Sequence, residues 1–196
     1  MLSREFEEKV RHLSEKVVGN TLGNTQITAD ALTLMCLLLT LGVVWLLVEG
    51  ALLGAGILFL IASSFDLLDG ALARSKGTAR PFGAFLDSTV DRYSELLVFL
   101  GLLINHLYGA PVDPLYVTLL FVGSHGSLLT SYTRARAEAL GYDGRGGLLD
   151  RPGRVILLAA GLLTGWLMPC LLLLAVLTHI SALQRIMFVW RQSKQS

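Results

Sequence analysis

Four aspartates between residues 66 and 91 stand at spacings that suit a metal centre. Asp66 and Asp69 are three residues apart, and Asp87 and Asp91 are four residues apart. On an α-helix these spacings place both members of a pair on one face. The flanking sequence is strongly apolar, so the four carboxylates repel one another and lose hydration. A divalent cation relieves this repulsion, and magnesium prefers hard oxygen ligands, so we expect a metal site here.

Small residues and an arginine stand between the aspartates. Gly70 and Ala73 let a phosphate or a base approach the backbone closely. Arg74 can contact a phosphate or another part of a nucleotide, and Gly83 lets its helix come near a neighbouring helix. The full pattern is Asp-x2-Asp-Gly-x2-Ala-Arg-x8-Gly-x3-Asp-x3-Asp.

This pattern indicates phosphoryl chemistry. Two metal ions a few ångströms apart clamp a phosphoryl group and stabilise both the entering and the leaving oxygen. A carboxylate that is not fully used by metal can accept a proton from an attacking hydroxyl. The alternative is that the acids are interfacial charges at helix ends, paired with Arg74, Arg80 and Arg92, and such exposed pairs contribute little. The joint spacing of the four acids favours the metal-dependent interpretation.

The elements that position these residues are predicted to cross a membrane. Hydrophobic residues make up 53% of the 196-residue chain, and the mean hydropathy is +0.61, as in membrane proteins. We expect an all-α polytopic integral membrane protein, with Pro169 at the turn between the last two spans. A span takes about 20 residues. The six expected transmembrane helices lie near residues 30–49, 52–74, 83–107, 114–137, 153–168 and 170–191.

The basic residues predict the orientation of the chain. All 16 Lys and Arg residues lie beyond or near the same end of the expected spans, and the connections near residues 50, 110 and 168 carry none. By the positive-inside rule, both termini and the four aspartates face the cytoplasm. The basic residues are Arg4, Lys9, Arg11, Lys16, Arg74, Lys76, Arg80, Arg92, Arg134, Arg136, Arg145, Arg151, Arg154, Arg185, Arg191 and Lys194.

The first 20 residues are expected to form a separate element. Apolar residues recur there every three to four positions, with Glu and Lys between them. We interpret residues 1–20 as an amphipathic helix on the membrane surface, and residues 21–196 as one six-helix domain. The alternative is a helix packed on a cytoplasmic protein face. The apolar residues are Leu2, Phe6, Val10, Leu13 and Val17.

The aspartate pattern resembles the signature of the CDP-alcohol phosphotransferases in every fixed position. Members of that family exchange the CMP of a CDP-alcohol, often CDP-diacylglycerol, for an incoming alcohol. The resemblance implies that Asp66, Asp69, Asp87 and Asp91 bind two Mg²⁺ ions, for which Mn²⁺ can substitute. It also implies that Asp91 is the general base.

The same resemblance implies a CDP-lipid site. Gly70 and Arg74 are expected to hold the CDP group, beside Ala73 and Gly83. Arg80 either contacts the pyrophosphate or faces solvent. The start of the first span is similar to the nucleotide-contacting turn of the family. This turn consists of Asp30, Ala31, Leu32 and Thr33.

The second half of the chain resembles the phosphatidylinositol-phosphate synthase branch, which uses inositol 1-phosphate. The similar runs are SYTRARAEALG and GRGGLLDRPGR. Three basic residues of that branch grip the inositol phosphate, and the matching positions are Arg134, Arg154 and Arg185. Arginine suits bidentate phosphate binding. Arg185 lies within an apolar segment, where an unpaired charge is costly, so we expect a ligand or an acidic partner. Arg136 and Arg151 either join the site or only fix the topology.

We therefore expect a membrane enzyme that transfers the phosphatidyl group of CDP-diacylglycerol to inositol 1-phosphate, with phosphatidylinositol phosphate and CMP as products. The resemblance also implies a homodimer. Glycerol 3-phosphate as acceptor and an archaeal-type CDP-lipid as donor stay as alternatives, because the arginines alone cannot separate acceptors that carry phosphate. A cation transporter is a more distant alternative, since a transporter usually places its charges near the bilayer midplane.

Overall fold

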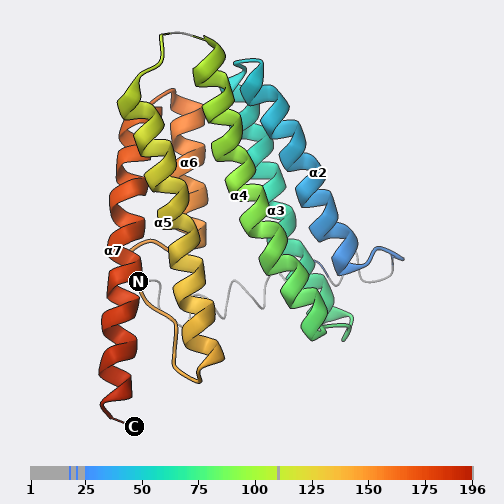
Figure 1. Ribbon diagram of the computed structural model, residues 1–196. Coiled ribbons are helices and arrows are strands. Elements are labelled where there is room, and N and C mark those ends of the chain that lie inside the picture. The colour runs from blue at the N-terminus through green and yellow to red at the C-terminus, as the bar shows by residue number, and fades with distance from the viewer. Residues whose placement is uncertain (1–17, 19–20, 22–24, 110, 196) are drawn as a thin grey trace.

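The computed structural model describes residues 18, 21, 25–109 and 111–195. These residues form long helices and no β-strand (Figure 1). The all-helical prediction is thus confirmed for the described part of the chain. The helices are α2 (Ala29–Val48), α3 (Leu52–Ser75), α4 (Pro81–Gly109), α5 (Pro114–Ala139), α6 (Arg151–Thr164) and α7 (Leu167–Ser193).

These helices coincide with the six apolar segments expected from the sequence, and the main difference lies between the last two. Helix α6 ends at Thr164, and Gly165 follows with a φ of 76°, which glycine adopts without a steric cost. Pro169 then lies inside the first turn of α7, where its missing N–H has no helical partner to lose. The expectation that Pro169 marks this turn is therefore wrong.

Three of the helices are long and apolar enough to cross a membrane by length and composition. They are α2, α3 and α7. Helix α6 has only 14 residues, and α4 carries several charged side chains in its first half. The predicted amphipathic helix at residues 1–20 lies outside the described residues, apart from Val18. That residue is buried and packs with Leu32 and Leu72.

The helices form two groups that pack against each other. In one group α2 packs closely on both α3 and α4, and in the other α7 packs on both α5 and α6. The groups meet through α3 on α6 and α4 on α5 (Figure 1). Gly56 permits the first of these contacts, because a Cβ there would lie only 3.0 Å from the Cβ of Leu162. This packing brings the end of α3 that carries the aspartates close to the start of α6.

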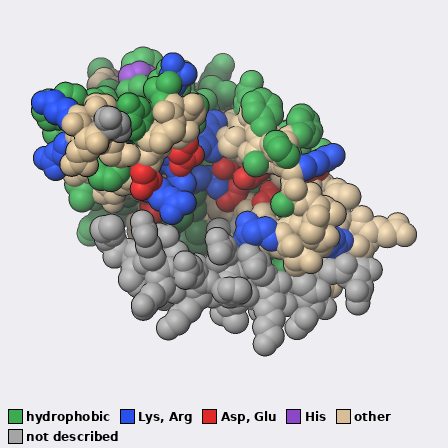
Figure 2. All heavy atoms as spheres, turned by 90° about the horizontal axis from the view of Figure 1, so that it is seen from below, with side chains coloured by type: hydrophobic (Ala, Val, Ile, Leu, Met, Phe, Trp, Pro, Cys, Tyr) green, Lys and Arg blue, Asp and Glu red, His purple; other side chains and the backbone are tan. Residues whose placement is uncertain are grey.

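Large apolar side chains cover much of the outer surface. Trp45, Leu38, Phe121 and Leu183 are each more than half exposed. A monomeric soluble protein rarely exposes so many apolar groups, whereas lipid would cover them. The core and the outer surface are therefore both apolar, and the polar and charged side chains concentrate at one end of the bundle, between the two groups of helices. Figure 2 shows acidic and basic side chains gathered in this recess.

Candidate active site

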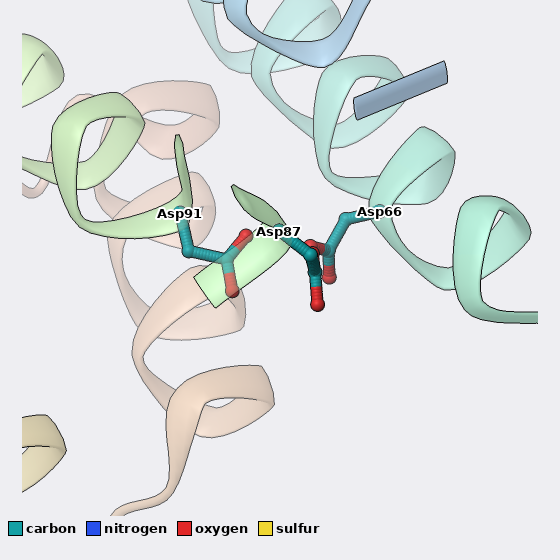
Figure 3. A group of neighbouring side chains, drawn as sticks. All are labelled: Asp66, Asp87 and Asp91. Carbon is teal, nitrogen blue, oxygen red and sulfur yellow. The ribbon is translucent and has the colours of Figure 1, made fainter. Parts of the chain in front are cut away.

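Three of the four predicted aspartates meet at this end of the bundle. Asp66 comes from α3, and Asp87 and Asp91 come from the first turns of α4. One carboxylate oxygen of each lies within 4.8 Å of the others (Figure 3). The close packing of α2 with both α3 and α4 holds the two pairs of aspartates near each other. The spacing in the sequence predicted each pair, and the packing of the helices joins them.

The fourth aspartate is oriented toward a different helix. Asp69 is 3% exposed, and its Oδ2 accepts a hydrogen bond of 2.5 Å from Oγ1 of Thr33 on α2. Thr33 is the last residue of the predicted nucleotide-contacting turn. This hydrogen bond links that turn directly to the aspartate pattern. The role of Asp69 as a metal ligand stays a prediction.

An arginine that the sequence left undecided lies in the aspartate cluster. Nη1 of Arg151 donates to Oδ2 of Asp66, and Nη2 lies 2.5 Å from Oδ1 of Asp91. The carboxylates of Asp66 and Asp91 thus supply counter-charges to the Arg151 guanidinium. Asp150 fixes the position of Arg151, because its side chain accepts a hydrogen bond from the Gly153 N–H and so begins α6.

The donor set fits a divalent cation. Oδ1 of Asp87 is buried and has no hydrogen-bond partner among the described residues. Buried carboxylate oxygens almost always have a hydrogen-bond partner or a bound cation, so we expect a cation or a further hydrogen-bond donor at this atom. Hard carboxylate oxygens from two helices at this separation are suitable ligands for Mg²⁺ or Mn²⁺.

A second polar cluster lies one turn further along α4. Glu95 accepts two hydrogen bonds from Arg154 on α6, and Arg154 also donates to Thr130 and Ser131 on α5. Arg154 is only 3% exposed. The sequence predicted that Arg154 binds the acceptor phosphate, but it did not indicate Glu95, Thr130 or Ser131 as its partners. Glu95 could have been found from its position four residues after Asp91, which places both acids on one helical face.

The three arginines predicted to bind the acceptor phosphate lie in this same region. Arg185 on α7 is buried and donates to the carbonyl oxygens of Thr130 and Gly146, the latter at 2.7 Å. Thr130 therefore touches both Arg154 and Arg185. Arg134 lies one turn beyond Thr130 and is half exposed, with its Nε 2.9 Å from Oε1 of Glu138. The partners described for Arg185 are backbone carbonyls and not the acidic side chain that we considered.

Some of the residues predicted to contact the CDP-lipid lie around Asp30, at the start of α2. Arg80 forms an ion pair with Asp30, and a Cβ on Gly83 would lie 3.5 Å from Oδ1 of Asp30. A Cβ on Gly70 would likewise lie 3.2 Å from Nη1 of Arg74. The small residues thus stand where charged side chains approach the backbone.

The remaining predicted CDP-lipid residues differ in exposure. Ala31 is exposed and Ala73 is half-buried. Leu32 is buried in an apolar cluster with Ala71 and Leu72, so only its backbone is available to a nucleotide.

A pocket lined by α2, α3, α4 and α6 joins the two polar clusters. Its polar wall comprises Asp91, Glu95, Arg151 and Arg154, and apolar residues such as Phe59 close the other side. A pocket with a few convergent charged groups on an apolar wall is the usual form of a small-molecule site. The pocket thus places the carboxylate of Asp91 and the guanidinium groups of Arg151 and Arg154 in one small space.

The chain is similar to proteins of known sequence family and structure. The sequence model for CDP-alcohol phosphatidyltransferases matches residues 26–191. The archaetidylinositol phosphate synthase of Pyrococcus horikoshii is 34% identical over 187 residues, which cover 95% of each chain.

Solved structures show the same similarity. The crystal structure of Mycobacterium tuberculosis phosphatidylinositol phosphate synthase with CDP-diacylglycerol bound superposes with a TM-score of 0.81 at 32% identity. The match covers 91% of this chain and 94% of that one. A second crystal structure of that synthase, in complex with manganese and citrate, superposes equally well at 33% identity and covers 90% and 88% of the two chains.

Proposed function

Because the chain belongs to the CDP-alcohol phosphatidyltransferase family, we propose that it transfers the phosphatidyl group of CDP-diacylglycerol to inositol 1-phosphate. The products are phosphatidylinositol phosphate and CMP. The observation that carries this proposal is the Asp66, Asp87 and Asp91 cluster, which stands beside the buried basic residue Arg154. The names of similar synthases, one of them crystallised with CDP-diacylglycerol, support the choice of donor and acceptor.

The aspartates would hold the metal. We assign Asp66, Asp87 and Asp91 as ligands from their mutual distances, and Asp69 from the family pattern. Two Mg²⁺ ions, or Mn²⁺ in their place, would supply positive charge to the phosphates of the donor when bound. The manganese in the crystal structure of the mycobacterial synthase supports the use of a divalent ion.

The reaction then requires a base and a firmly held donor. Asp91 accepts the proton of an inositol hydroxyl, the hydroxyl oxygen attacks the β-phosphorus, and the bond from that phosphorus to CMP breaks. Gly70, Ala73 and Gly83 leave room for the CDP group, and Arg74 and Arg80 contact its phosphates. Asp30 to Thr33 form the turn that meets the nucleotide. The Thr33 hydrogen bond to Asp69 supports this assignment, because it ties the turn to the reacting centre.

The acceptor phosphate is assigned to the arginines of the second cluster. Arg154 and Arg185 come from different helices and share Thr130 as a partner. Arg134 lies one turn away on α5 and reaches solvent. Guanidinium groups bind phosphate through two parallel hydrogen bonds, and a dianion in this recess needs several cations.

The membrane arrangement is also part of the proposal. Six helices of residues 21–196 cross the bilayer, residues 1–20 lie on its surface, and both termini and the active site face the cytoplasm. The location of all Lys and Arg residues beyond or near the same end of the spans supports this orientation. A homodimer is proposed from the family alone.

One variation of the donor has specific support. A relative that covers 95% of the chain is named archaetidylinositol phosphate synthase, so an archaeal-type isoprenoid CDP-lipid is the second candidate donor. The chemistry at the phosphates would be the same, because the difference lies in the lipid tails.

The test is a comparison of substrates with purified protein in detergent. CMP release is measured in the presence of Mg²⁺ with CDP-diacylglycerol or the archaeal-type CDP-lipid as donor. One acceptor is supplied at a time: inositol 1-phosphate, glycerol 3-phosphate, free inositol or serine. We expect inositol 1-phosphate to be used at least tenfold more efficiently than the others, and Asp91→Asn to be inactive. A preference for glycerol 3-phosphate would contradict the assignment of inositol 1-phosphate as acceptor. CMP release by Asp91→Asn would contradict the assignment of Asp91 as the base.

A further inference from the structure

Both oxygens of Asp91 are engaged by arginines. Oδ1 lies 2.5 Å from Nη2 of Arg151, and Oδ2 lies 3.0 Å from Nη1 of Arg92. Oδ2 of Asp66 accepts from the same Arg151 guanidinium. The oxygens that a cation and a reacting proton need on Asp91 are therefore held by positively charged side chains.

The two arginines hold the cluster in different ways. Arg92 neighbours Asp91 on α4 and also donates to the carbonyl of Ser88, so both of these hydrogen bonds lie within one helix. Arg151 comes from α6 and bridges Asp66 on α3 and Asp91 on α4. Movement of the Arg151 side chain alone would free one oxygen on each of the two carboxylates at once.

A divalent cation and the Arg151 guanidinium compete for this space. Both are positive, and Asp66 and Asp91 belong to the group of carboxylates that could hold the cation, so close approach of one raises the free energy of the other. Arg151 has room to move, because its side chain is 27% exposed and borders the pocket that joins the two polar clusters. The buried Oδ1 of Asp87 has no hydrogen-bond partner among the described residues, so a cation would meet no competing donor at that atom.

We propose that Arg151 is the exchangeable counter-ion of the carboxylate cluster: it joins Asp66 to Asp91 when no divalent cation is bound and gives up their oxygens when a cation enters. This inference rests on the proposed function, since it takes these carboxylates as the metal ligands. The alternative role is that of a fixed support, in which Arg151 orients the two carboxylates for the metal. The two roles predict opposite changes in metal affinity when the charge is removed.

The test is Mn²⁺ binding by full-length protein in detergent, followed by the electron paramagnetic resonance signal of free Mn²⁺. Arg151→Gln should bind Mn²⁺ at least tenfold more tightly than the unaltered protein, and its thermal unfolding temperature should rise more when Mn²⁺ is added. Arg151→Lys, which keeps the charge but cannot bridge two carboxylates through a planar fork, should fall between them. Arg136→Gln, an exposed change on α5, is the matched control and should leave affinity unchanged.

Equal Mn²⁺ binding by Arg151→Gln would overturn the exchange, and weaker binding would overturn it and favour the fixed support. A second measurement uses the unaltered protein, so its outcome does not depend on whether the Arg151 variants fold. Phenylglyoxal modification of Arg151, followed by peptide mass spectrometry, should become faster with Mn²⁺, and a rate that falls or stays constant would contradict the proposal. CMP release by the same preparation distinguishes failure of the Arg151 exchange from failure of the proposed function. If the enzyme is active but Arg151 does not exchange with Mn²⁺, only this inference is contradicted. If the protein binds no Mn²⁺, the metal site is contradicted as well.

Discussion

The Arg154 guanidinium donates to both oxygens of the Glu95 carboxylate, from Nε to Oε1 at 2.7 Å and from Nη2 to Oε2 at 3.0 Å. The two side chains are 3% and 14% exposed, and they come from α6 and α4. The pair thus joins the two groups of helices beside the active site. It also fixes the direction of Arg154, which we assign to the acceptor phosphate.

Loss of Glu95 should be costly because Arg154 would stay buried without a counter-charge. Glu95→Gln is expected to lower the free energy of unfolding by about 3 kcal/mol, as for other buried pairs that lose one partner. Glu138→Gln is the control, since its pair with Arg134 is half exposed and should contribute under about 1 kcal/mol. Unfolding in detergent measures both changes. Equal losses of unfolding free energy in the two variants would show that the buried Glu95–Arg154 pair contributes no more to stability than the half-exposed Glu138–Arg134 pair.

The hydrogen bond from Thr33 to Asp69 should matter for stability. Thr33→Val keeps the shape of the side chain but leaves a buried carboxylate without this donor, which should cost about 2 kcal/mol of unfolding free energy. Thr33→Ser should restore most of that loss. Thr178→Val is the control, because the Thr178 hydroxyl donates only to carbonyls of its own helix. The prediction is wrong if the two valine variants unfold alike.

The sequence predicted the parts of the structure that depend on local pattern. Apolar length placed the helices within a few residues, and spacings of three and four placed each pair of aspartates on one helical face. The pattern failed at Pro169, since proline is tolerated in the first turn of a helix as readily as between helices. Local signals also could not show whether every helix crosses the membrane.

The pairing of charges between helices could not be predicted. Arg151 lies 85 residues from Asp66, and Arg154 lies 59 residues from Glu95. No spacing in the sequence encodes these contacts, because they depend on how α6 packs against the other group of helices. For the same reason the sequence left open whether Arg151 belongs to the site.

Replacement of Arg185 should weaken mainly the binding of the acceptor, inositol 1-phosphate. Arg185→Ala removes a buried cation from the proposed phosphate site, so KM for inositol 1-phosphate should rise at least tenfold while KM for CDP-diacylglycerol changes little. Steady-state CMP release at varied acceptor and donor concentrations measures both constants. Arg191→Ala, an exposed change near the end of the same helix, is the control. Unchanged acceptor KM in Arg185→Ala would remove Arg185 from the phosphate site.

Gly126 allows α5 to pack closely on α7. A Cβ at Gly126 would lie 2.1 Å from Oγ1 of Thr178, so Gly126→Ala forces either the Thr178 side chain or the two helices to shift. We expect a loss of about 1–3 kcal/mol of unfolding free energy, as for other overpacked sites. Gly54→Ala should be neutral or stabilising, because its Cβ would meet only Leu46 at 3.7 Å and alanine favours the helix. Equal effects of the two alanines on unfolding would contradict this packing.

The most direct measurement is anomalous X-ray diffraction at the manganese edge from crystals of the protein grown with saturating Mn²⁺. The account predicts strong anomalous density among the carboxylates of Asp66, Asp87 and Asp91, which already lie within 4.8 Å of one another. Density at that place should disappear in crystals of Asp87→Asn and Asp91→Asn combined. If the unaltered protein showed only water there, with no anomalous signal, the metal centre and the lipid-synthesis function proposed from it would both be contradicted.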